Sequence, residues 1–441
     1  MNKLFFPLFL LISVVWSGFS AHAQQAFSLQ ECVQYAGEQD ILMQNYSKDQ
    51  LISQQTLRQS RSKYLPQVSA VGDFRDNLQL QTSILPFNPD PTGVRGPTPV
   101  RFGTTYNTTL ALDASLVLFD PTLRNTLRSQ EINTQIAENN YAQRNLEVVV
   151  NLKKAYYAAL INRQKISYNQ TKLARLRKLL EDAQVRLETE QLQAIEVRRQ
   201  EWDLKTQEIE IERLQVLYDQ SLLQVKFWMG YPLEQPISLK DSLPQQLRLE
   251  QNAEIDWNNR YDLKNLEAQR MQNNLEVQKY KRQYLPTVTL YGYLGTQAFQ
   301  NNFAQAFQTW FPLSYVGLRV NVPIFDGLSK NYQIQGAKIQ TEKKENEIKQ
   351  LQRQAVYDNQ LSQTNIQNLI KTLSIRQNAL AFAEENVQYV LNRYEAGLVL
   401  YREVVDAEVK ITEAQNAYLQ TYQDLVNAYW DGQKVRGETE K

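Results

Sequence analysis

The sequence predicts a mostly helical protein with a smaller β component, in which a unit of helix, β-hairpin, long helix and shorter helix occurs twice. The tripeptide Tyr-Leu-Pro indicates the duplication. It stands at 64–66 and again at 284–286, each time between a long polar stretch and an alternating one. Composition indicates the helices: the 441 residues include only 15 Gly, and no Pro lies between Pro121 and Pro232.

The first 23 residues have the pattern of a secretory signal peptide. Lys3 precedes an apolar run from Leu4 to Trp16, and small residues lead to a predicted cleavage after Ala23. The run is shorter than the roughly 20 residues that a membrane-spanning helix needs. We therefore expect residues 1–23 to be removed on export, leaving a mature chain that begins at Gln24.

The first repeat is predicted over 24–230. Its opening helix, over 29–63, ends where Pro66 disfavours a helical conformation for the residue before it. Two hairpin strands follow, at about 67–80 and 104–119. In the second strand the even positions from 110 to 118 are apolar and most odd positions are polar, which predicts one apolar and one polar face.

The connection between these strands, 86–99, is rich in Pro and is expected to be a mobile outer loop. After the hairpin, Asp120 fits a helix cap and Pro121 the first helical position. A helix over about 122–188 follows, and a second over about 194–229 is expected to fold back beside it.

The second repeat, 254–432, follows a linker at 231–253. Its predicted parts, in chain order, are a helix over about 254–283, hairpin strands at about 287–297 and 313–325, a helix to about 394, a shorter helix, and a tail at 433–441. Four residues are expected to carry the chain between helices and strands: Pro66, Pro121, Pro286 and Gly327.

The long helix of the second repeat carries an apolar seam with three-and-four spacing, which favours coiled-coil packing over a solvated single helix. The seam positions are Ile366, Leu369, Leu373, Leu380, Ala383, Val387, Val390 and Tyr394, with Arg376 as the one exception.

Charge and composition exclude several function classes. The net charge is +1, and loss of Lys3 with the signal peptide makes it zero, so no basic surplus indicates nucleic acid. The single His, His22, lies in the signal peptide, and Cys32 is the only Cys. The mature chain therefore has no Ser-His-Asp set, no Cys-His pair and no His-bearing metal site, and we expect neither an enzyme nor a cofactor.

Strands with one apolar and one polar face suit a barrel in an outer membrane, with the apolar side against lipid. A bilayer leaves no strand edge unpaired, and closure takes at least about eight strands, whereas one chain supplies four. Several copies would have to close the sheet. Two alternatives remain open: a soluble β-sandwich for the strands, and a periplasmic coiled-coil adaptor or scaffold for the whole chain.

The chain resembles the TolC family of outer-membrane efflux channels. The resemblance rests on the repeated Leu-Pro breaks, on PIFDG at 323–327 and on RYEAGLVLYREVVDAE at 393–408, all in one order. It implies a homotrimer with a twelve-stranded barrel in outer-membrane lipid and a long helical barrel in the periplasm. It also implies a periplasmic adaptor (membrane fusion) protein and an inner-membrane transporter as partners in efflux or type I secretion.

The resemblance further implies an acidic ring where the helices reverse in the periplasm. Its members would be Glu403, Asp406 and Glu196, with Tyr394 in the same constriction. The family's basic latch residue aligns with Val399, so nearby basic residues are expected to substitute for it: Arg198, Arg199 and Arg402. Gly397 would turn the second tip, whereas its counterpart in the first repeat is Glu190, so the first tip is expected to differ in shape.

Overall fold

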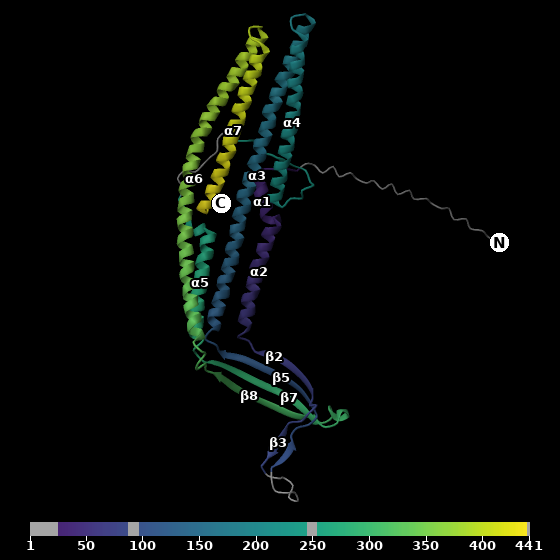
Figure 1. Cartoon of the computed structure of the whole chain (residues 1–441), viewed down its shortest axis with the longest axis vertical. Coiled ribbons are helices and arrows are strands. Elements are labelled where there is room, and N and C mark those ends of the chain that lie inside the picture. Colours follow the sequence, from purple (N-terminus) through teal and green to yellow (C-terminus); the bar gives the residue numbers. More distant parts are fainter. Residues whose placement is uncertain (1–24, 87–96, 245–253, 439–441) are drawn as a thin grey trace, which may run out of the picture. The chain divides into compact units, whose positions relative to one another are not determined.

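The computed structural model describes residues 25–86, 97–244 and 254–438. The predicted signal peptide lies outside these residues, as do most of the predicted Pro-rich loop, the end of the predicted linker and the last three residues of the predicted tail. The described chain is mostly helical with a smaller β part, as the sequence predicts (Figure 1).

The elements follow in chain order: β1 (Gln25–Phe27), α1 (Leu29–Gln39), α2 (Ile41–Ser62), β2 (Gln67–Asp76), β3 (Thr82–Leu85), β4 (Thr98–Arg101), β5 (Tyr106–Phe119), α3 (Leu123–Glu188), α4 (Ala194–Met229), β6 (Ile237–Leu239), η1 (Trp257–Asn259), α5 (Tyr261–Arg282), β7 (Thr287–Gln300), η2 (Phe303–Gln305), β8 (Phe311–Asn321), α6 (Ser329–Glu395) and α7 (Tyr401–Arg436).

The chain divides into two compact units, which we describe separately. The sheet unit comprises 45–144, 254–359 and 435–441, and so holds the main sheet and the helix segments that enter it. The helical unit comprises 1–44, 145–253 and 360–434, and so holds the two helix reversals. No helix in the described part of the chain is both long enough and apolar enough to cross a membrane.

The main sheet of the sheet unit has four antiparallel strands in the order β2-β5-β7-β8. Each repeat contributes one hairpin, and the two hairpins join where β5 pairs with β7. The strands β2 and β8 are therefore the two edges, and neither has a further strand beside it among the described residues. Because all pairs are antiparallel, the two edge strands also run in opposite directions.

The register gathers the apolar residues on one face. Leu112 of β5 lies opposite Ala70 of β2 and Leu294 of β7, and Leu290 of β7 lies opposite Leu318 of β8. The alternate positions form a polar face, where Asp113 lies opposite Ser69 and Tyr293. Leu112, Leu294 and Leu318 stay between 47% and 62% exposed, so the sheet has a largely uncovered apolar face.

Three strands share one end with the prediction, since β2 and β7 begin and β5 ends at the predicted residue, whereas β8 differs at both ends. β2 ends at Asp76 rather than at 80, and β7 continues to Gln300 rather than 297 because that residue pairs with Tyr106. β8 covers 311–321 instead of 313–325; Pro323, which lacks a backbone N–H, follows its end. A short ribbon of β3 and β4 lies between β2 and β5 in the chain; β3 precedes the expected loop at 86–99 and β4 overlaps its end.

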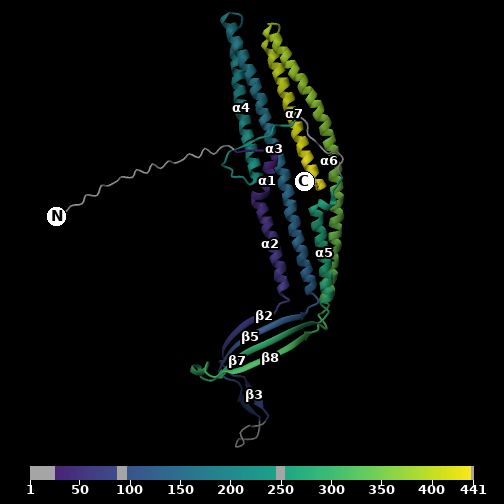
Figure 2. The same cartoon turned by 180° about the vertical axis from the view of Figure 1, so that it is seen from behind.

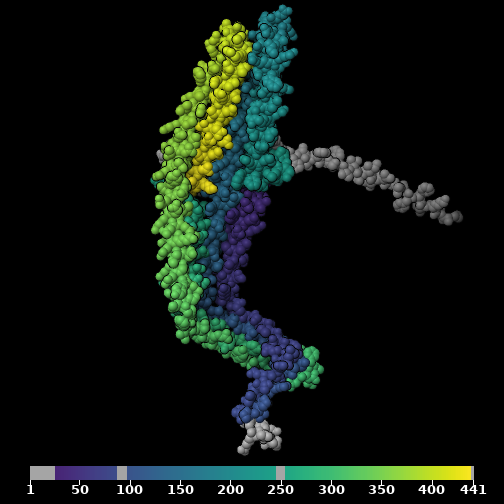
Figure 3. Space-filling model, viewed as in Figure 1, coloured from purple at the N-terminus to yellow at the C-terminus, as the bar shows by residue number. Residues whose placement is uncertain are grey.

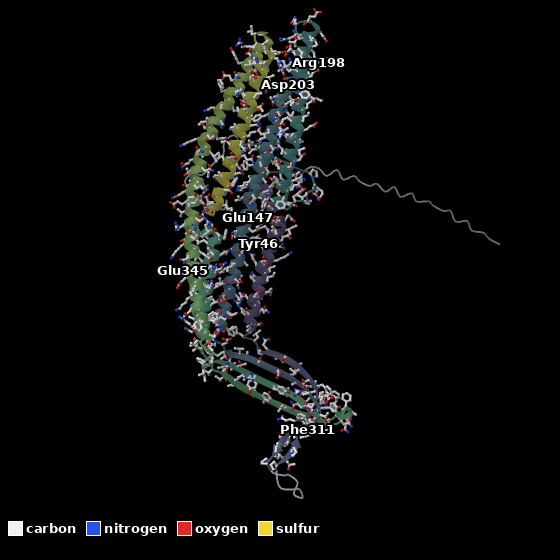
Figure 4. The ribbon with its side chains drawn as sticks, in the orientation of Figure 1. Tyr46, Glu147, Arg198, Asp203, Phe311 and Glu345 are labelled. Carbon is white, nitrogen blue, oxygen red and sulfur yellow. The ribbon has the colours of Figure 1, made fainter. Side chains whose placement is uncertain are left out.

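Aromatic side chains pack at the loop end of the sheet, where Phe311 begins β8 (Figure 4). Phe74 stacks on Tyr106 and on Phe307, with ring centroids 6.1 and 5.8 Å apart. The loop after β7 is held to the sheet by the Thr108 hydroxyl, which donates to the carbonyl of Ala306 at 3.2 Å.

The first predicted helix is two helices, α1 and α2, because the backbone is extended at Asp40 (φ −62°, ψ 121°). The Asp40 carboxylate accepts a hydrogen bond from the N–H of Met43 at 2.7 Å and so caps α2. The end of α4 packs against this break. A Cβ on Gly230 would lie 2.9 Å from the carbonyl oxygen of Gln39.

The core of the helical unit forms along the predicted seam. Leu380, Ala383, Val387 and Tyr394 of α6 are buried, together with residues of α7 and α3: Leu176, Leu179, Tyr401, Val404, Ala407 and Ile411. Arg376, the exception in the sequence pattern, is exposed. In this unit α3 and α7 lie between α4 and α6, which form the two outer sides (Figures 1 and 2).

Candidate functional site

The two helix reversals of the helical unit have the same turn geometry. Glu190 has φ 60° and Gly397 has φ 72°, so both backbones are left-handed. The N–H of Gln191 donates to the carbonyl of Arg186 at 2.8 Å, and that of Leu398 donates to Arg393 at 2.9 Å. This is the hydrogen bond of a Schellman cap. The expectation that the first tip differs in shape is therefore wrong: Glu190 adopts a conformation that normally favours Gly.

Two tyrosines next to the second reversal join it to α4. The Tyr401 hydroxyl donates to the carboxylate of Asp203 at 2.9 Å, and the amide of Gln200 donates to the Tyr394 oxygen at 3.3 Å. The two rings lie edge to face with centroids 6.1 Å apart, and the Arg186 guanidinium of α3 lies 5.2 Å from the centre of the Tyr394 ring. Side chains from all four helices therefore meet just inside the tips.

A buried ion pair lies deeper in the same region. Arg175 of α3 donates two hydrogen bonds to the carboxylate of Glu408 of α7, at 2.6 and 2.8 Å. The Glu408 side chain is only 4% exposed. Loss of Arg175 would leave that carboxylate buried and unpaired, which is far costlier than loss of a surface pair. The pair therefore fixes α7 against α3.

Exposed ion pairs surround this network. Lys178 of α3 donates to Glu395 at the end of α6 at 2.7 Å, and this hydrogen bond is the main cause that raises the pKa of Lys178.

Burial, followed by the hydrogen bond to Asp203, raises the pKa of Tyr401 above its ordinary value, so its phenol stays protonated well above neutral pH.

Of the three carboxylates of the predicted ring, Glu196 and Glu403 lie in the first helical turn after a reversal, and Asp406 lies one turn further along α7. Glu403 and Asp406 are exposed on α7, and neither has an ion-pair partner among the residues that the structure describes. Glu196 is half-buried in the first turn of α4 and lies 3.8 Å from Arg199. Of the predicted set, the structure thus brings together only Glu196 and Arg199 as an ion pair.

The remaining predicted tip residues have separate surroundings. Arg198 and Arg402 are exposed, and Arg198 lies on α4 near Asp203 and the α3–α4 reversal (Figure 4). Val399 packs against the apolar core of the helical unit. Tyr394 is 4% exposed, so within one chain it belongs to the core.

Sequence reasoning missed Asp203, Gln200, Arg175 and Glu408. One signal was present for Glu408: it follows Tyr401 by seven residues on the same helix, α7, and seven residues is the period of a coiled-coil seam. A carboxylate at a seam position requires a buried cation as partner. The sequence does not reveal that the cationic partner of Glu408 is Arg175, because this depends on the alignment of α3 with α7.

The four transition residues lie where helices and strands meet in the sheet unit. Pro66 and Pro286 stand immediately before β2 and β7. Pro121 follows Asp120, whose carboxylate accepts from the N–H of Thr122 at 2.8 Å. Gly327 has φ 67°, and the next residue, Leu328, is also left-handed.

Two exposed apolar stripes follow the outer sides of the helical unit. On α4 the stripe consists of Ile195, Trp202, Ile209, Val216 and Leu223, which are spaced by seven residues and are 45% to 73% exposed. On α6 it consists of Leu361, Ile375, Phe382 and Tyr389, which are 56% to 72% exposed and fit the same period. Such stripes are typical of helices that pack against further helices. Figure 3 shows α6, α7 and α4 on one face of the molecule.

A duplicated hairpin with one apolar face, together with paired coiled-coil reversals, defines the class of outer-membrane channel components. The chain belongs to the outer membrane efflux protein family, whose pattern matches residues 38–231 and 257–430. This confirms the resemblance to the TolC family that the sequence motifs indicate. No curated protein sequence matches the chain.

Solved channels share the fold at low sequence identity. The Campylobacter jejuni CmeC outer membrane channel is 14% identical with a TM-score of 0.73, covering 93% of this chain and 85% of CmeC. VceC of Vibrio cholerae is 17% identical with a TM-score of 0.70, covering 93% and 96%. The open state of the Neisseria gonorrhoeae MtrE channel is 16% identical with a TM-score of 0.71, covering 93% and 88%.

Proposed function

We propose that this protein is the outer-membrane exit duct of a tripartite efflux or type I secretion system. In this proposal three copies form one twelve-stranded barrel in outer-membrane lipid, and their helices continue as a helical barrel in the periplasm. A periplasmic adaptor and an inner-membrane transporter supply the cargo, which is a small molecule or a protein.

One observation carries the proposal: in the part of the chain that the structure describes, the apolar face and the two edge strands of the four-stranded sheet are uncovered. Unpaired backbone groups cannot face a bilayer interior, so an inserted sheet must close. The edge strands β2 and β8 run in opposite directions, so β8 of one copy can continue the antiparallel sheet at β2 of the next. An interface between two different surfaces closes into a ring when its repeated rotation adds up to a full turn.

The helical unit supports the same assembly independently. The helices α4 and α6 form the two outer sides of the unit and each carries an exposed apolar stripe, so α4 of one copy can pack against α6 of the next. The stripes also have the heptad spacing that knobs-into-holes packing requires. The family match gives the class, and the number three comes from the TolC resemblance.

We also propose that the duct is gated at the helix reversals. The side chains of Glu403, Asp406 and Glu196 would form an acidic ring at the aperture, and Arg199, Arg198 and Arg402 would help to hold it narrow. An acidic ring favours cations. The network of Tyr401, Asp203, Arg175 and Glu408 would keep the helix pairs of one copy together. Among the solved channels with the same fold, MtrE is described in an open state.

Recordings in planar bilayers test this function. We expect the purified full-length chain to form cation-preferring channels, and Glu403→Gln/Asp406→Asn to move the reversal potential toward zero in a salt gradient. A matched control, Glu188→Gln, neutralises an exposed carboxylate at the end of α3. Absence of any conductance would overturn the duct, whereas unchanged selectivity in the double variant would overturn only the acidic ring.

A periplasmic adaptor or scaffold that never inserts is the second candidate. Its helices would be equally compatible with the coiled-coil seam, but it would have no use for the uncovered apolar face of the sheet. Recovery of the chain from the soluble periplasmic fraction, with none in outer membranes, would favour this candidate over the duct.

A further inference from the structure

A cavity of about 380 Å³ lies between the start of α3 and the end of α5 in the sheet unit. Arg124, Arg128 and Arg282 line it, together with the amide side chains of Asn274 and Gln278. Its lining includes no acidic residue, so the cavity is surrounded by three positive charges and by neutral hydrogen-bond donors.

None of the three guanidinium groups has a carboxylate partner within 4.0 Å among the described residues. Arg282 instead donates to the side-chain oxygen of Asn125 at 2.7 Å. Asn125 is 4% exposed and in turn donates to the carbonyl of Leu275 at 3.1 Å. This chain of hydrogen bonds holds Arg282 of α5 against the first turn of α3.

The arrangement of Arg124 and Arg128 is unfavourable without a negative charge nearby. The two residues are four apart on α3, so their like charges face each other across one turn. Arg124 also lies in the first turn of α3, at the positive end of the helix dipole, where a cation destabilises a helix. Arg282, at the end of α5, has the favourable orientation and would need no ligand on its own.

We propose that this cavity binds the anionic phosphate group of a phosphate ester. Guanidinium groups present paired N–H donors that match phosphate oxygens, and they bind phosphate more tightly than isolated point charges do. Met271, which is 51% exposed, and Leu275 line the same cavity and suit the carbon chain of such an ester.

The phosphate can come from a lipid headgroup or from a soluble molecule. The cavity adjoins the start of α3, which follows β5, and the end of α5, which precedes β7; if these strands cross the outer membrane, it lies at the headgroups of the periplasmic leaflet. This choice of source rests on the proposed function. The anion site itself rests only on the cavity and its arginines.

Two arms of one experiment separate the sources, using the full-length chain and native mass spectrometry. In the first arm the chain is placed in nanodiscs of phosphatidylcholine with one fifth phosphatidylglycerol, and the retained lipids are counted. In the second, inorganic phosphate is titrated into the chain in neutral detergent. Arg124→Gln/Arg128→Gln is compared with Arg124→Lys/Arg128→Lys and with Arg353→Gln/Arg376→Gln, which removes two exposed arginines elsewhere.

We expect the Gln double variant to lose at least about tenfold in affinity, because two guanidinium groups that would form charge-assisted hydrogen bonds to the phosphate are removed. The Lys variant should lose less, and the Arg353/Arg376 control nothing. Selective loss of retained phosphatidylglycerol supports a lipid, and selective loss of phosphate binding alone supports a soluble ester. Equal binding by wild type and a folded Gln variant in both arms would overturn the site. Failure of the chain to conduct ions in bilayers would not overturn the anion site, because phosphate binding in detergent does not require a channel.

Discussion

At the residue scale, Glu190 carries backbone strain that its counterpart avoids. Both tip residues have a left-handed backbone. Gly397 lacks the Cβ that makes this conformation unfavourable, whereas Glu190 has one. A left-handed L-residue costs about 1–2 kcal/mol. Glu190 is exposed, so the structure gives its side chain no evident packing role.

Glu190→Gly should therefore raise the free energy of unfolding by about 1 kcal/mol, since it relieves the strain and loses no packing. Thermal unfolding of the full-length chain, followed by circular dichroism, measures the change. Gly397→Ala should have the opposite effect. A lower unfolding temperature for Glu190→Gly would contradict the strained turn.

The hydrogen bond from Tyr401 to Asp203 gives a pH-dependent prediction. Tyr401→Phe should lower stability by roughly 1–2 kcal/mol near neutral pH, because a buried hydrogen bond to a charged group is lost. Folding raises the pKa of Tyr401, so the contribution is complete below the ordinary tyrosine pKa of about 10 and declines as the pH rises above it.

Unfolding midpoints of wild type and variant at pH 7 and above pH 10 measure this difference. Tyr357→Phe, at a tyrosine that is 59% exposed, is the control and should change neither midpoint. A difference between wild type and Tyr401→Phe that grows with pH would show that the sign of the pKa shift is wrong.

At the scale of elements, we propose that the stripes on α4 and α6 carry the contact between copies. Trp202→Glu or Phe382→Glu would place a charge in a desolvated helix–helix interface, at a cost of several kcal/mol. Either variant should dissociate the assembly while each chain keeps its helix content. Gln215→Glu, which adds a charge to an exposed position of α4 outside the stripe, should leave the assembly intact. Light scattering of the detergent-solubilised chain measures the mass.

The elements also indicate what sequence alone can predict. Hydrophobic periodicity and the positions of Pro predict the bounds of the long helices to within a few residues, because α3 and α4 contain no helix breaker. The break at Asp40 depends on packing against the end of α4, which no local pattern reports. The candidate site divides in the same way: Glu403, Asp406 and Glu196 come from the family resemblance, whereas Asp203 and Arg175 depend on how helices distant in sequence align.

At the scale of the whole molecule, one chain leaves two sets of surfaces uncovered. Among the described residues, the sheet unit has free strand edges and an exposed apolar face, and the helical unit has exposed apolar stripes on α4 and α6. In the proposed assembly both units contact further copies of the chain. The sheet unit does so by backbone pairing of strand edges, and the helical unit by packing of side chains.

The copy number of the intact protein, extracted from outer membranes in mild detergent and weighed by native mass spectrometry, tests this most directly. We predict a single species of three chains that persists on dilution. A stable monomer would mean that strand edges and stripes need no second copy, and would contradict the shared duct.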